Sequence, residues 1–164
     1  MFEPLFLWLE STALSVWIVE SPSLFAFPGI LALHTVGLGL LAGLSTALDL
    51  RLLGAAPAIP TSAFLRFRPM MWVGLWLNVL SGLALLLAYP TKALTNPVFY
   101  LKLALIAAAL VLLRTLLRES RADALIHRRT KVLAVVSLVI WAAAITAGRL
   151  LAYTCTRLTV DVSC

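Results

Sequence analysis

The longest apolar run of the sequence extends from Pro28 to Gly54, PGILALHTVGLGLLAGLSTALDLRLLG, and carries no charge before Asp49. A run of about 20 apolar residues is long enough to cross the hydrocarbon core of a bilayer as a helix. Within it stands His34, and an ionisable ring inside a membrane is costly unless it faces protein, water or a cofactor. His34 is therefore the leading candidate for a functional residue.

Three further apolar segments predict helices, from about Ser62 to Ala88, from Pro97 to about Leu117 and from about Val132 to Tyr153. Of the 164 residues 62% are hydrophobic and only 12% are charged, with a mean hydropathy of +1.03, which is the composition of an integral membrane protein. Four such helices joined by short loops predict an all-α, four-transmembrane-helix up-down bundle over residues 28–153.

The segment before this bundle has a different character. Residues 1–22 favour helix but are interrupted by Glu3, Glu10 and Glu20. Carboxylates at these positions disfavour a membrane span, so we expect an amphipathic helix that lies in the membrane interface, with a shallow spanning helix as the alternative. Residues 154–164 form a short tail after the last span.

The basic residues predict the orientation of the helices. The net charge of +6 indicates topology rather than nucleic-acid binding, because Lys and Arg mark the cytoplasmic ends of membrane helices. We therefore expect a bacterial-type inner membrane protein with both termini extracytoplasmic. The residues on the side of the first and third loops are Arg51, Arg66, Arg68, Arg114, Arg118, Arg121, Arg128, Arg129 and Lys131.

Both cysteines fall in the C-terminal tail. Cys155 and Cys164 lie on the oxidising side of the membrane in this topology, so we expect them to form a disulfide. In the inverted topology they would be two reduced thiols.

Two cations fall at the same predicted depth as His34. Helical rise puts His34 about 9 Å, Lys102 about 7–8 Å and Arg149 about 6 Å from the outer ends of their helices. Gly37 lies on the face of His34, where it either leaves room for a flat ligand or lets a neighbouring helix pack closely. An axial histidine with two cations at the propionates suits haem b, so the expected cofactor-binding residues are His34, Gly37, Lys102 and Arg149, with His34 as the metal ligand.

Three stretches also resemble a known group of membrane proteins. LHTVGLGLLAG, FLRFRPMMWVGLWLNVLSGLALLL and YLKLALIAAALVLL resemble, in that order, helices of the CopD-like copper-resistance proteins and the HemJ-like haem-containing protoporphyrinogen oxidases. The likeness covers roughly residues 33–117. It implies haem contact for His34 and a role in the site for Lys102.

Three functions follow as hypotheses. The first is a haem b-binding protein in electron transfer or haem-linked redox chemistry, which includes a haem-dependent membrane oxidoreductase. The second is a CopD-like protein that transports copper or a small solute, and the third is a cofactor-free subunit of a larger membrane complex. If His34 is the only protein ligand, the iron is five-coordinate or is shared with a second chain, so a homo-oligomer is a further expectation.

Overall fold

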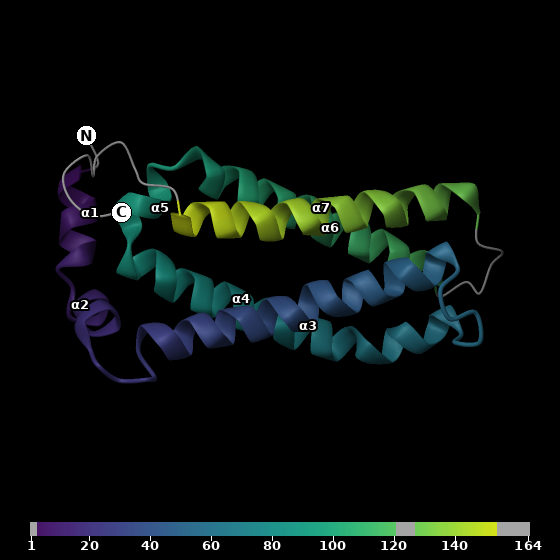
Figure 1. Cartoon of the computed structure of the whole chain (residues 1–164), viewed down its shortest axis with the longest axis horizontal. Helices are drawn as coiled ribbons and strands as arrows, with labels where there is room; N and C mark the ends of the chain where they lie inside the picture. Colours follow the sequence, from purple (N-terminus) through teal and green to yellow (C-terminus); the bar gives the residue numbers. More distant parts are fainter. Residues whose placement is uncertain (1–2, 121–126, 154–164) are drawn as a thin grey trace.

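Four long helices lie side by side along the long axis of the protein (Figure 1). The computed structural model describes residues 3–120 and 127–153, and within these ranges it contains helices and no strands. All four helices are long and apolar enough to cross a membrane, counting a short 3-10 helix as the start of the second. The predicted all-α membrane bundle is confirmed. The four helices are α3 (Phe27–Leu53), α4 (Arg68–Ala88), α6 (Pro97–Glu119) and α7 (Arg128–Tyr153).

The bundle consists of two helical hairpins. α3 packs along α4, α6 packs along α7, and the contact between α3 and α7 joins the two pairs. Within the described residues α4 and α6 make few contacts with each other. The fourth side of the bundle, between α4 and α6, is therefore its least closely packed side.

Residues with fixed backbone preferences mark the ends of these helices. Gly54 ends α3 in the left-handed region at φ 112°, which glycine adopts without a steric penalty. Asn96 caps α6 by accepting a hydrogen bond from the backbone N–H of Val98. Pro69 lies in the first turn of α4, where its missing N–H costs nothing, so it starts this helix instead of kinking it. A 3-10 helix, η1 (Thr61–Phe67), precedes it.

The N-terminal segment differs from the expected single helix. It forms two short helices, α1 (Glu3–Glu10) and α2 (Ala13–Glu20). They separate at Thr12, whose extended backbone caps α2 while its hydroxyl accepts a hydrogen bond from the N–H of Ser15. The segment is helical as expected, but the cap at Thr12 divides it into two helices, because a residue that caps one helix does not continue the helix before it.

Both short helices pack against the end of the bundle where α3 begins and α4 ends (Figure 1). The Glu10 carboxylate accepts the backbone N–H of Thr91, at 3.4 Å, in the small helix α5 (Pro90–Leu94). The Ser15 hydroxyl donates to the carbonyl of Ala88 at 3.5 Å, and Ile18 is fully buried. These polar contacts explain why a segment rich in carboxylates docks on an apolar bundle.

The closest approach of two helices occurs between Gly37 of α3 and Gly74 of α4. A Cβ atom on Gly37 would lie 2.7 Å from the backbone N of Asn78 and 2.8 Å from the carbonyl oxygen of Gly74. Gly37 therefore packs α3 on α4, and the expectation that it leaves room for a flat ligand was wrong. Gly39 and Gly43 have no atom within 4 Å of their Cβ positions.

Candidate functional site

His34 lies on the α3 face that packs against α4. Its Nδ1 atom is 3.0 Å from the hydroxyl of Ser81, and its backbone carbonyl accepts a 3.0 Å hydrogen bond from the Asn78 amide. A Cβ atom on Gly82 would lie 3.3 Å from the imidazole Cε1. Ser81 thus contacts one edge of the half-buried imidazole, and Gly82, which has no side chain, leaves room for the ring beside α4.

The hydrogen bonds of Ser81 determine which nitrogen of His34 carries the proton. The Ser81 hydroxyl has one proton and donates it to the carbonyl of Leu77 at 2.5 Å. It must therefore accept a hydrogen bond from His34, which makes Nδ1 the protonated nitrogen. Nε2 then keeps its lone pair, and it has no hydrogen-bond partner in residues 3–120 or 127–153. This is the tautomer in which a histidine binds a metal or accepts a proton through Nε2.

Lys102 brings a positive charge to the same region from α6. Its half-buried side chain packs against Gly148 of α7, with Cε 3.5 Å and Nζ 3.7 Å from the position of a Cβ atom there. The ammonium group is near enough to His34 to interact electrostatically with the imidazole. The structure thus brings together two of the predicted site residues.

Arg149 follows Gly148 in α7, but its side chain is exposed. Within the described ranges it has no described contact with His34 or Lys102. The structure does not bring Arg149 into the site. The predicted disulfide between Cys155 and Cys164 lies outside the described residues and stays a prediction.

A buried polar seam, which the apolar pattern of the sequence does not predict, joins α3 to α7. Trp141 Nε1 donates a 2.9 Å hydrogen bond to the Ser45 hydroxyl, and both residues are buried. One helical turn away, Asp49 is fully buried beside Ser137. Neither carboxylate oxygen of Asp49 nor the Ser137 hydroxyl has a well-formed hydrogen bond within the described chain. One sequence signal for this seam is spacing. Ser45 and Asp49 are four residues apart in α3, and Ser137 and Trp141 are four residues apart in α7, so each pair lies on one face of its helix.

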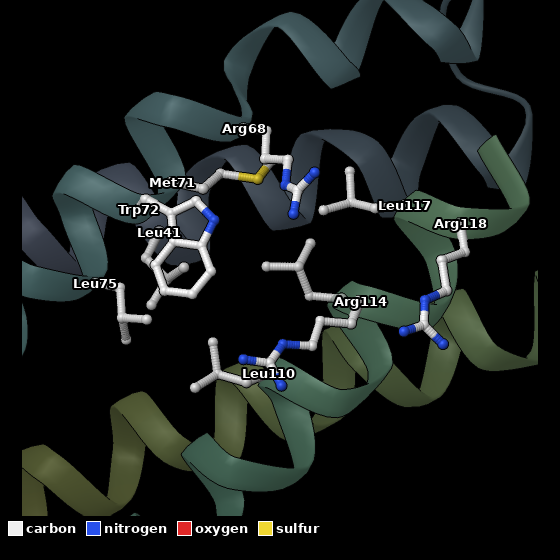
Figure 2. Close-up of a pocket in the computed structure, with 10 residues that line it drawn as sticks. Leu41, Arg68, Met71, Trp72, Leu75, Leu110, Arg114, Leu117 and Arg118 are labelled. Atoms are coloured by element: carbon white, nitrogen blue, oxygen red, sulfur yellow. The ribbon is translucent and has the colours of Figure 1, made fainter. Parts of the chain in front are cut away.

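A cavity of about 390 Å³ lies between α4 and α6 (Figure 2). Three arginines face it: Arg68 at the start of α4, and Arg114 and Arg118 in the last turns of α6. The sequence marks these arginines as topological signals and does not indicate that they line one cavity. The residues that line the cavity are Leu41, Arg68, Met71, Trp72, Leu75, Leu110, Leu113, Arg114, Leu117 and Arg118.

The donor set around His34 fits some metal groups better than others. Within the described residues no three His, Cys, Asp or Glu side chains group together as they would to hold a bare metal ion. A porphyrin brings four nitrogen ligands of its own, so one imidazole completes its attachment to the protein. Known protein families, curated proteins and solved structures offer no match to this chain.

Proposed function

We propose that this multi-pass membrane protein binds haem b through Nε2 of His34 and acts in electron transfer or haem-linked redox chemistry. The observation that carries the proposal is the 3.0 Å contact between His34 Nδ1 and the Ser81 hydroxyl. Metal-binding histidines usually donate their second ring nitrogen to a nearby acceptor, which fixes the tautomer and the ring orientation. The haem would supply reversible one-electron chemistry at its iron.

Lys102 supports the proposal as a partner for a haem propionate. It is half-buried in the membrane-spanning part of α6 and packs against Gly148. A buried ammonium group is costly unless an anion lies near it. A propionate would supply that anion, whereas Arg149, exposed on α7, is placed to reach the lipid headgroups.

The proposed site lies toward the extracytoplasmic side of a bacterial-type inner membrane. The support is the charge bias, because cytoplasmic loops are rich in Lys and Arg. Arg51, Arg66 and Arg68 flank the connection between α3 and α4, and Arg118, Arg128 and Arg129 flank the connection between α6 and α7. His34 lies near the opposite ends of the helices.

The test is the visible spectrum of the full chain, purified in mild detergent and reconstituted with haem b, in its oxidised and dithionite-reduced forms. We expect the sharp reduced bands of a b-type haem. His34→Ala should lose them, while His127→Ala, which alters an exposed histidine, should keep them. Circular dichroism checks that both variants remain helical. Retained bands in His34→Ala would refute His34 as the ligand, and a colourless reconstituted wild type would refute haem binding.

The coordination number connects this test with the oligomeric state. The other histidine of the sequence, His127, directly precedes α7. It is therefore at the opposite end of the bundle from His34, where α6 connects to α7. If His34 were the only protein ligand, the iron would be five-coordinate in a monomer or would be shared between the His34 side chains of two copies. A high-spin spectrum with monomer mass by light scattering supports the first arrangement, and a low-spin spectrum with dimer mass supports the second.

A further inference from the structure

The cavity between α4 and α6 has a charged end and an apolar end. Arg68 is the first residue of α4 and Arg118 lies in the last turn of α6. Both therefore lie at the end of the bundle where α3 connects to α4 and α6 connects to α7. Leu75 lies about 10 Å farther along α4 than Arg68, and Leu110 lies about 12 Å farther along α6 than Arg118. Both leucines line the same cavity. Arg114 lies between these two levels, so the cavity changes along the bundle axis from cations at one end to hydrocarbon at the other.

The three guanidinium groups face this space from two helices. Figure 2 shows Arg68 extending from α4, and Arg114 and Arg118 from α6, around one cavity. None of them forms a hydrogen bond or ion pair with another residue of the described ranges. The neighbouring acid, Glu119, leaves its Oε2 atom buried without a hydrogen bond. Three cations that line one cavity repel one another, so the site favours an anionic ligand.

The charged end and the apolar end of the cavity together indicate the chemistry of its ligand. Guanidinium groups bind phosphate oxygens through paired, charge-assisted hydrogen bonds. Leu41, Leu75 and Leu110, by contrast, offer a surface that stabilises a hydrocarbon chain. Trp72 lies between the charged end and the apolar end of the cavity. Tryptophan is enriched at the same level of a membrane, the boundary between lipid headgroups and hydrocarbon.

We propose that this cavity binds one anionic phospholipid, with its phosphate among Arg68, Arg114 and Arg118 and part of an acyl chain against the leucines. Basic pockets between membrane helices are recognised sites for anionic headgroups. A free phosphate would use the arginines and leave the apolar end without a partner. A cavity of about 390 Å³ lies within the roughly 300–1,000 Å³ typical of ligand pockets.

The experiment is native mass spectrometry of the full chain in mild detergent. The probes are phosphatidylglycerol, phosphatidylcholine with the same acyl chains, and inorganic phosphate. We expect phosphatidylglycerol to bind about tenfold more tightly than phosphatidylcholine, and Arg114→Gln or Arg118→Gln to remove most of that difference, since each loses a hydrogen bond to a charged group. The matched control is Arg129→Gln, an exposed arginine of α7 that does not line the cavity, and it should keep the preference.

The apolar end is tested separately. Leu110→Trp fills that end with the arginines intact and should weaken phosphatidylglycerol binding several-fold, while Arg114→Lys should give an intermediate affinity because it keeps the charge but loses the paired hydrogen bonds. Circular dichroism and thermal unfolding select the variants that fold. Equal binding of the two lipids would overturn the proposal, as would phosphate binding as tightly as phosphatidylglycerol, or an equal loss in Arg129→Gln.

Discussion

Trp141 of α7 donates a 2.9 Å hydrogen bond to the hydroxyl of Ser45 in α3. Both side chains are buried, and they lie on the contact that joins the two hairpins of the bundle. A hydrogen bond between membrane helices is worth about 0.6–2 kcal/mol. This one fixes the rotation of α7 against α3, because the indole N–H has no other acceptor in the described structure.

Trp141→Phe should lower the free energy of unfolding by about 1–2 kcal/mol, since it removes the donor and leaves the Ser45 hydroxyl without its partner. The double variant Trp141→Phe with Ser45→Ala should recover part of that loss, because the unpaired hydroxyl is gone as well. Thermal unfolding in one detergent measures both effects. Strictly additive losses in the double variant would contradict a coupling between the two side chains.

Asp49→Asn should leave the protein folded with an equal or higher midpoint of unfolding. An ionised carboxylate that is fully buried without a partner is costly, so the folded protein is expected to hold Asp49 as the neutral acid beside Ser137. The neutral amide has nearly the same shape. A hydrophobic carbodiimide, which reacts with protonated carboxyl groups, should label Asp49 and leave the exposed Glu20 unmodified. Strong destabilisation by Asn would instead indicate a charged partner for Asp49.

Gly37→Ala and Gly74→Ala should each destabilise the protein by about 1–3 kcal/mol, because the added methyl group overlaps backbone atoms of the facing helix. Gly39→Ala is the matched control in the same helix, with open space at its Cβ position. The fraction of monodisperse protein after heating reports all three variants. If Gly39→Ala proved equally harmful, an additional contact, such as a second chain, would have to cover that face.

Ser81→Ala should reduce haem retention about tenfold if His34 is the axial ligand, because Nδ1 loses its hydrogen-bond acceptor and the ring loses its orientation. Ser81→Thr keeps the hydroxyl and should retain most of the haem. The ratio of haem to protein after gel filtration is the measurement. Equal retention in Ser81→Ala and the wild type would show that this hydrogen bond does not support the ligand.

Glu10→Ala should loosen the N-terminal helices from the end of the bundle, because the backbone N–H of Thr91 loses its carboxylate acceptor. We expect proteolysis between α1 and α2 to become several-fold faster, as a loss of about 1 kcal/mol implies for a locally opening segment. Glu20→Ala, at an exposed position, should not change the rate. Unchanged cleavage in Glu10→Ala would show that apolar packing alone holds the segment.

The positions of the spans were predictable from local sequence. The run from Pro28 to Gly54 predicted α3 to within one residue at each end, because proline and glycine mark helix ends through their own backbone preferences. The break between α1 and α2 was missed, since the cap at Thr12 could not be told from an ordinary polar residue of an interfacial helix. His34 is a candidate from the sequence because an ionisable ring stands out in an apolar run; its role as a ligand stays a prediction.

The sequence by itself determined that four helices span a membrane and which ends carry the basic residues, because span length and charge are properties of each segment alone. Only the tertiary structure decided that Gly37 meets Gly74, that Ser81 holds His34, that Asp49 lies beside Ser137 and that three arginines face one cavity. The physical reason is that a helix apolar on all sides gives no signal for its rotation about its own axis. That rotation is set by close packing and a few buried hydrogen bonds with neighbouring helices, which exist only once the bundle has assembled.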